Sequence, residues 1–127
     1  MSPEPMTLAV GRLGWIQIDC ADPLRLATFW GAMLGQAFDQ PLGEPVHYIG
    51  LVPTTPGAAI VSFQRVPEAK AVKNRLHLDI EVDDVDVAAA RVVELGGSIA
   101  PGDDFHEYGF SWRLAADPEG NEFCLIF

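Results

Sequence analysis

The sequence predicts an α+β protein in which two βαβββ modules form a curled, mixed, mainly antiparallel sheet around a cleft. The first supporting observation is a repeat. The segment from Trp15 to Gly35 and the segment from His77 to Gly97, which lies 62 residues later, both run from a strand-like stretch through an aspartate to a helical stretch that ends in glycine. Such self-similarity indicates one supersecondary unit present twice. The second observation is that each copy passes from strand-like alternation to helical spacing of its apolar residues. The third is that short β-prone segments separated by proline and glycine follow each helix.

Length and composition restrict the class of protein. The chain of 127 residues has the length of one domain, which we expect to extend over residues 1–127, and its hydrophobic content of 49% excludes a disordered class. Its formal net charge is −10. This charge disfavours nucleic acid and anionic membrane surfaces as partners, because both are bound by basic patches. We interpret the acidity as a contribution to solubility.

The N-terminal segment and the cysteine content predict a cytoplasmic location. The first seven residues contain neither the basic nor the apolar region of a signal peptide, and no apolar run is long enough to cross a membrane. Only two cysteines are present, Cys20 and Cys124, so a disulfide framework is not expected. We expect the residues up to about Arg12 to form a loose leader or a short edge segment, since Pro3 and Pro5 oppose regular structure.

The first module is expected over about residues 13–66. Leu13 to Cys20 alternates and is rich in β-branched and aromatic residues, which predicts a strand. Asp22 is the expected N-cap of a helix with Pro23 at its first position, and Gly35 is expected to end that helix. Three further strands are predicted near residues 36–40, 46–52 and 58–66.

A linker over residues 67–74 and a second module over about residues 75–127 follow. The second module is predicted to begin with a strand over Leu76–Val82, and Asp83 or Asp84 is expected to cap its helix. The sequence Asp117-Pro-Glu-Gly-Asn121 has the composition of a turn, and His106–Tyr108 is placed in a loop that could line a cavity entrance. The remaining strands are predicted near residues 98–101, 109–115 and 121–127.

Two motifs carry a resemblance to a known family. The first helix is led by Asp22-Pro23 and ends in Phe-Trp…Leu-Gly, and Asp117-Pro-Glu-Gly-Asn-Glu-Phe-Cys124 lies near the C-terminus. With the duplicated module, these motifs resemble the vicinal oxygen chelate superfamily of glyoxalases, bleomycin-resistance proteins and dioxygenases, in its glyoxalase-like branch. The resemblance covers roughly residues 13–127. It implies a homodimer, but it says little about activity, because one fold hosts many functions.

The resemblance also implies four inward positions that hold a divalent metal in the metalloenzymes of the superfamily. In this sequence they are Trp15, Ser62, His77 and Cys124. Such a metal needs several nitrogen or oxygen donors converging from both halves. Trp15 cannot be a ligand and Ser62 is a poor neutral donor, so we expect no metal and no other cofactor. The alternative is a divalent metal bound by His77 and Cys124 with Gln17 and water.

His77 is the candidate catalytic residue, as a general base in the cleft. The alternative role is that of a strand histidine hydrogen-bonded in the cavity wall. Cys124 could act as a nucleophile with His77 as its base, but a buried, inert thiol is the commoner state of such a cysteine. No third group that would orient His77 is evident in the sequence.

The candidate ligand-binding residues combine aromatic rings with polar groups. Trp15 and Trp112 could stack on an aromatic or apolar ligand, whereas Trp30 belongs to the helix face expected in the core. A basic side chain at the start of the second module could bind an anionic group at the cleft mouth. Gln17 lies two residues after Trp15, and Gln64 lies two residues after Ser62. Each glutamine is therefore expected on the same face of its strand as that neighbour. The full predicted set is Trp15, Gln17, Ser62, Gln64, Arg75, Trp112 and Cys124.

Three hypotheses about function follow. The first is the binding of a small, aromatic or amphipathic molecule in the cleft between the modules, without the usual divalent metal. The second is a metal-dependent lyase, isomerase or dioxygenase of the same superfamily, in which a metal polarises a substrate oxygen. The third is a metal-free acid–base enzyme that uses His77.

Overall fold

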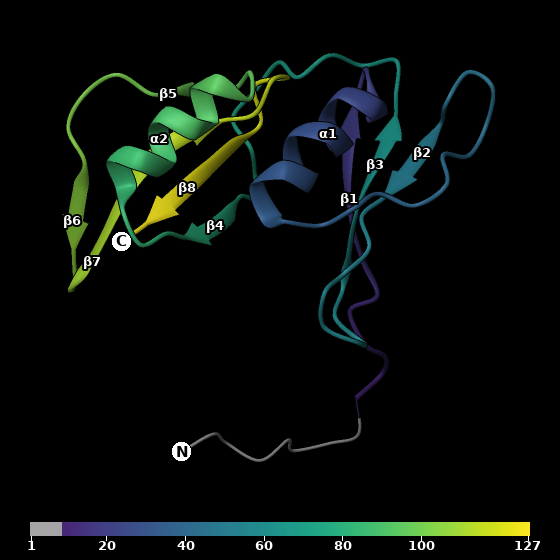
Figure 1. Ribbon diagram of the computed structural model, residues 1–127, viewed down its shortest axis with the longest axis horizontal. Helices are drawn as coiled ribbons and strands as arrows, with labels where there is room; N and C mark the ends of the chain where they lie inside the picture. The colour runs from purple at the N-terminus through teal and green to yellow at the C-terminus, as the bar shows by residue number, and fades with distance from the viewer. Residues whose placement is uncertain (1–8) are drawn as a thin grey trace.

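The computed structural model describes residues 9–127 and contains the two expected modules (Figure 1). The first module consists of β1 (Trp15–Cys20), α1 (Pro23–Leu34), β2 (Tyr48–Gly50) and β3 (Ile60–Arg65). The second consists of β4 (Leu78–Glu81), α2 (Val85–Glu94), β5 (Ser98–Ile99), β6 (Phe105–Glu107), β7 (Phe110–Ala116) and β8 (Glu122–Ile126). No helix within residues 9–127 combines the length and the apolar character needed to cross a membrane.

The strands form one open, mixed sheet in each module, in the orders β1-β3-β2 and β4-β8-β7-β5, with β6 paired to β7. The pairs β1–β3 and β4–β8 are parallel and the other pairs are antiparallel. The repeat extends to the register: Gln17 is opposite Ser62, and Asp79 is opposite Cys124, each 62 residues later. The predicted α+β class with mixed sheets is therefore confirmed; the sheet of the second module is mainly antiparallel, whereas that of the first contains one parallel and one antiparallel pair.

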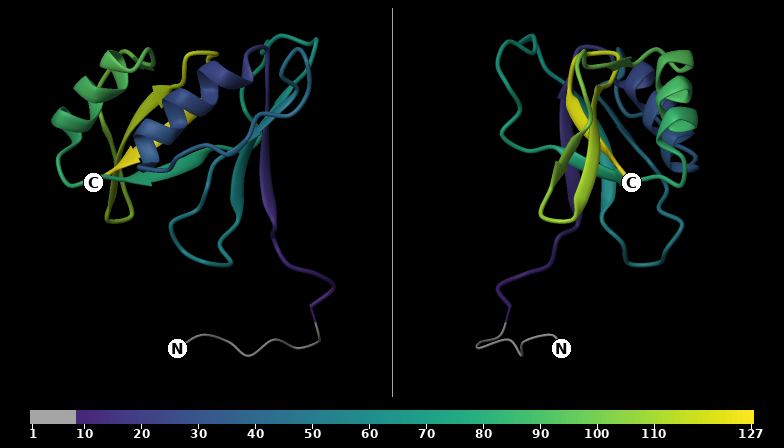
Figure 2. Two further views of the ribbon diagram at one scale, coloured as in Figure 1. Left: turned by 45° about the vertical axis from the view of Figure 1, so that its right-hand side comes forward. Right: turned by 90° about the vertical axis from the view of Figure 1, so that its left-hand side faces the viewer.

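Both helices begin where the sequence predicts. The Asp22 carboxylate accepts a hydrogen bond from the backbone N–H of Arg25, and the Asp84 carboxylate accepts one from that of Val87. Gly35 ends α1 in the left-handed conformation, with φ of 66°, which favours glycine. Figure 2 shows both helices on the same side of the strands. Within residues 9–127, no helix covers the opposite faces of the sheets, which carry exposed side chains such as Trp15 and Asp79.

The core is shared between the modules. Phe29 and Trp30 of α1 are both buried, and their rings contact the ring of Phe123 in β8 at centroid distances of 6.1 Å and 4.7 Å. Helix α1 thus buries part of its apolar face on the sheet of the other module. The expectation that Trp30 is a core residue is confirmed, and the two modules are held together by the same buried cluster.

Two local predictions are wrong. The strand predicted over residues 36–40 is reduced to one isolated bridge between Phe38 and Leu51, since Pro41 and Gly43 follow immediately and oppose an extended ladder. Of the loop predicted over His106–Tyr108, His106 and Glu107 instead form the end of β6, which pairs with β7, and only Tyr108 lies outside a strand. Tyr108 and Gly109, at φ of 51° and 81°, form the two-residue turn between them. The usual signal for such a turn is asparagine or aspartate before glycine.

Candidate functional site

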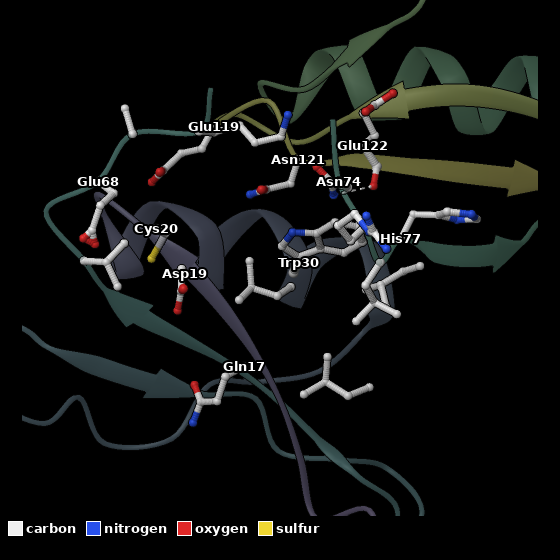
Figure 3. A pocket seen from close by; sticks show the side chains of 18 residues that line it. Gln17, Asp19, Cys20, Trp30, Glu68, Asn74, His77, Glu119, Asn121 and Glu122 are labelled. Atoms are coloured by element: carbon white, nitrogen blue, oxygen red, sulfur yellow. Dashed lines mark hydrogen bonds between the residues drawn. The ribbon is translucent and has the colours of Figure 1, made fainter. Parts of the chain in front are cut away.

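A pocket of about 350 Å³ lies between the two modules (Figure 3). We call it the inter-module pocket. Its walls come from β1, from the segment that leads into β4, and from the turn before β8. Gln17 and Asp19 line it from the first module, Asn74 lines it from the linker, and Arg75 and His77 line it from the second module. Three residues of the predicted site, Gln17, Arg75 and His77, are therefore brought together in one cavity.

A second pocket of about 340 Å³ lies on the open face of the first sheet, and we call it the first-sheet pocket. Trp15, Gln17 and Ser62 line it, together with apolar side chains and the ring of Tyr48. Trp15 is 62% exposed although it lies within a strand. Gln17 lines both pockets, so the two pockets adjoin at this side chain.

The turn before β8 fixes the wall that separates the inter-module pocket from the core. The buried Asp117 carboxylate accepts a hydrogen bond from the Trp30 indole at 3.1 Å and one from the Asn121 amide at 2.9 Å. The Glu119 carboxylate accepts the backbone N–H groups of Ala21 and Asp22 at 2.7 Å and 2.8 Å. The sequence predicts the turn correctly, but not these contacts to the other module, because nothing in its composition indicates which groups lie opposite it.

His77, Asp79 and Cys124 form a cluster on the open face of the second sheet. One donor atom from each residue lies within 4.8 Å of the other two. The imidazole Nδ1 of His77 is 3.1 Å from Oδ1 of Asp79, and both side chains are about half exposed. Sequence reasoning missed Asp79. Its position two residues after His77, and hence on the same face of the strand, was the available signal.

The environment of Cys124 favours its protonated thiol. Burial raises the pKa of Cys124, and the negative charge of Asp79 and a hydrogen bond to it raise the pKa further. A thiol with a raised pKa is a poor nucleophile, because the thiolate is the reactive form. Asp79 does supply the orienting partner for His77 that the sequence did not reveal, yet its charge opposes ionisation of the neighbouring thiol. The arrangement therefore disfavours Cys124 as a nucleophile.

The four-donor metal centre of the superfamily does not fit these residues. Trp15 has no atom that can ligate a divalent metal. Ser62 is buried and donates its hydroxyl proton to the carbonyl oxygen of Ile49 at 3.1 Å. Only His77 and Cys124, both from the second module, remain as donors among the four positions. A centre that draws its ligands from both modules thus lacks one half of its ligand set.

The remaining predicted residues lie outside these cavities. Gln64 is opposite Asp19 on one side and Tyr48 on the other, but it lines neither pocket. Trp112 does not line them either: its ring stacks on Phe105 at 5.4 Å, with an interplanar angle of 11°. The predicted aromatic pair of Trp15 and Trp112 is thus not brought together in one pocket.

Comparisons with known proteins agree with this fold. The family model of the glyoxalase-like domain matches residues 15–126. No curated protein matches the chain. Among solved structures, a possible glyoxalase from Bacillus cereus is 16% identical, with a TM-score of 0.68, and the match covers 94% of this chain and 100% of that one. The fosfomycin resistance protein FosX from Mesorhizobium loti is 17% identical, with a TM-score of 0.66 and coverage of 94% and 92%.

A third solved structure, a hypothetical protein SA1046 from S. aureus, is 18% identical. Its TM-score is 0.67, and the match covers 93% of this chain and 98% of that chain. At these identities the likeness concerns the fold alone. The range that the family model matches includes all the predicted site residues, from Trp15 to Cys124.

Proposed function

The chain belongs to the glyoxalase-like domain family within the vicinal oxygen chelate superfamily, and from this premise we propose that it binds a small aromatic or amphipathic molecule without the four-donor metal centre. One observation carries the proposal. Trp15 stands where the resemblance implies a metal ligand, and its ring is exposed on the wall of a pocket. An exposed indole on a concave surface is suited to stacking on a ligand.

The two adjoining pockets both combine apolar and polar groups. The first-sheet pocket presents the rings of Trp15 and Tyr48 beside Asp39, and the inter-module pocket presents Asp19, Arg75 and His77 beside apolar side chains such as Leu76. Volumes near 350 Å³ and 340 Å³ are suited to small ligands. Because Gln17 lines both pockets, a ligand with an apolar ring and a polar end fits across them. This arrangement favours an amphipathic ligand over a wholly apolar one.

Calorimetric titration of the purified protein with a panel of aromatic carboxylates and aromatic amines tests the proposal. We expect at least one compound to bind with 1:1 stoichiometry. Trp15→Ala should weaken that binding by about tenfold or more, since a lost aromatic contact and its buried area cost about 1.5 kcal/mol. Trp15→Phe should retain most of the affinity.

Two controls make the test specific. Val87→Ala removes an exposed apolar side chain on α2, outside both pockets, and should leave affinity unchanged. Trp112→Ala removes the other candidate aromatic residue. If the affinity were lost in Trp112→Ala and kept in Trp15→Ala, the ligand would bind on the second sheet and the proposal would be wrong. Absence of binding by every compound would also contradict it.

A second candidate function is a metal-free acid–base enzyme that uses His77, and the contact between His77 Nδ1 and Asp79 Oδ1 at 3.1 Å favours it. A carboxylate on Nδ1 orients an imidazole and leaves Nε2 free to exchange a proton with a substrate. His77→Ala should then abolish any activity found. Asp79→Asn should lower kcat more than it changes KM. Activity that survives His77→Ala would exclude this function.

We also propose, from the resemblance, that the protein is a homodimer and, from its low cysteine content, that it is cytoplasmic. Light scattering coupled to size-exclusion chromatography tests the first expectation through the mass in solution, and fractionation of source cells tests the second. The net charge of −10 supports a small molecule as the partner over nucleic acid or an anionic membrane.

A further inference from the structure

We propose that the first-sheet pocket binds a methylated ammonium group, held by the rings of Trp15 and Tyr48 and by the carboxylate of Asp39. This inference rests on the proposed function, because it concerns the same pocket, and it names the chemical class of the group that the pocket takes. The group is an organic cation that contacts aromatic faces, and not a metal ion held by donor atoms.

Two small residues form the floor of this pocket. Strands β2 and β3 pair Gly50 directly with Ser62, and both residues line the pocket. A methyl group added to Gly50 would lie 3.4 Å from Cγ2 of Ile60 and 3.8 Å from the hydroxyl oxygen of Ser62. Because directly opposite residues point to the same face of a sheet, this methyl group would enter the pocket. The glycine therefore leaves a hollow that any other residue would fill.

Two aromatic rings flank the floor. Trp15 begins β1 and Tyr48 begins β2, and both line the pocket. Trp15 is 62% exposed, so its ring is accessible to a ligand. The ring of Tyr48 packs edge-on against that of His47 at a centroid distance of 4.6 Å, which restricts its orientation. The face of an aromatic ring attracts a cation that lies within about 6 Å of its centroid, so both rings are suited to an ammonium group.

The charge of the pocket also complements a cation. Among the residues within 9–127 that line it, Asp39 is the one charged residue, and none is a lysine, arginine or histidine. The backbone N–H of Asp39 donates a hydrogen bond to the carbonyl oxygen of Gly50 at 2.8 Å, which holds Asp39 beside the floor. Its Oδ1 accepts the backbone N–H of Gln40 at 2.7 Å, and its Oδ2 accepts no hydrogen bond from the described residues. This second oxygen can therefore face a bound cation.

The lining favours a methylated ammonium over a primary one. A primary ammonium has three N–H donors, and each needs an acceptor when it leaves water. The amides of Gln17 and Gln40 could accept such bonds, but both residues are exposed and compete with water for them. A trimethylammonium group has no N–H, and its methyl groups can contact rings and apolar side chains. The pocket supplies apolar side chains from Leu42, Val52 and Pro53.

Calorimetric titration of the full-length protein with three probes that share a phenyl ring tests this inference. The probes are benzyltrimethylammonium, benzylammonium and phenylacetate. We expect benzyltrimethylammonium to bind more tightly than benzylammonium, and at least about tenfold more tightly than phenylacetate, which carries the opposite charge. Choline should likewise bind more tightly than its neutral tert-butyl analogue, in which a carbon atom replaces the charged nitrogen.

Three variants test the residues that would hold the cation. Asp39→Asn retains the acceptor for the N–H of Gln40 but removes the charge, and Tyr48→Leu retains an apolar side chain but removes the ring. Each should weaken the binding of benzyltrimethylammonium by about threefold or more and should not weaken that of phenylacetate. Gly50→Ala fills the floor, so it should weaken the binding of benzyltrimethylammonium more than that of the smaller benzylammonium.

Two further variants are matched controls for the loss of a negative charge. Asp19→Asn removes a carboxylate that lines only the adjoining inter-module pocket. Glu107→Gln removes an exposed carboxylate on β6 of the second sheet. Both change the net charge by the same amount as Asp39→Asn, and both should leave the affinity for benzyltrimethylammonium unchanged, because salt screens the interaction between distant exposed charges.

Three results would overturn the inference. The first is phenylacetate that binds as tightly as benzyltrimethylammonium. The second is an affinity for benzyltrimethylammonium that is unchanged in both Asp39→Asn and Tyr48→Leu. The third is an affinity that falls in Asp19→Asn and not in Asp39→Asn, which would place the cation in the inter-module pocket.

The proposed function and this inference can be separated by the same titrations. Aromatic compounds that bind through Trp15 without any preference for the cation would contradict the inference alone and leave the proposed function standing. Absence of binding by every compound would contradict both.

Discussion

The indole Nε1–H of Trp30 donates a hydrogen bond to Oδ2 of Asp117 at 3.1 Å, and this bond joins helix α1 of the first module to the turn before β8 of the second. Both side chains are almost fully buried. The same carboxylate accepts the backbone N–H of Glu119 and of Asn121. The turn is thus both a local structure and a contact between modules.

Trp30→Phe should destabilise the protein by about 1–3 kcal/mol, because the buried Asp117 carboxylate loses a donor that water cannot replace. Urea unfolding followed by circular dichroism measures the change. Trp15→Phe is the control, since Trp15 is exposed and its substitution should stay within about 0.5 kcal/mol of wild type. Equal effects of the two substitutions would show that this hydrogen bond does not contribute to joining the modules.

Glu119→Ala should lower the free energy of unfolding by about 1 kcal/mol, because the backbone N–H groups of Ala21 and Asp22 lose their acceptor. Glu119→Gln retains one acceptor oxygen and should fall between alanine and wild type. Glu94→Ala removes an exposed pair with Arg91 and should cost no more than about 0.5 kcal/mol. A cost for Glu119→Ala that does not exceed that for Glu94→Ala would contradict this prediction.

Tyr108→Asn should stabilise the protein by about 0.5–1 kcal/mol, because asparagine tolerates the positive φ of this turn position better than tyrosine does. The side chain of Tyr108 is almost fully exposed, so little packing is lost. Thermal unfolding measures the shift. Tyr108→Val should have the opposite sign, since a β-branched residue is strained at positive φ. A lower midpoint for the asparagine variant would contradict the prediction.

Stability should fall as the pH rises above about 8.5, the ordinary pKa of an unfolded cysteine. Burial, followed by the charge of Glu119, raises the pKa of Cys20 to about 12, and burial and Asp79 also raise the pKa of Cys124. The folded state therefore keeps these protons where the unfolded chain has lost them, so alkaline pH favours unfolding. Stability below pH 8 is unaffected by these two groups.

Urea unfolding at several pH values between about 7 and 10 tests this dependence. Cys20→Ser should remove part of the alkaline decline, and the double variant with Cys124→Ser should remove more. A decline of unchanged steepness in the double variant would assign it to other groups. The reaction rate with a thiol reagent gives an independent measure: Cys124 should react faster in Asp79→Asn, whereas Cys20 should not change.

Much of the fold could be predicted from the sequence, and the candidate site only in part. Asp22, Asp84 and Gly35 begin or end their helices as expected, because capping depends on a few neighbouring backbone groups. The partner of His77 was missed because an aspartate in a strand has no local signature of function. Trp112 was expected beside Trp15, but its ring stacks on a strand that the sequence did not predict.

The sequence by itself determined the duplicated module and its capped helices, whereas the register of Gln17 with Ser62 and of Asp79 with Cys124 came from the structure. The duplication and the caps follow from short-range patterns and from a repeat at constant spacing. Only the tertiary structure decided that α1 packs on β8 through Trp30, and that the predicted ligand residues divide between two pockets. The physical reason is that such contacts depend on how the modules pack against each other, and local patterns along the chain do not encode that placement.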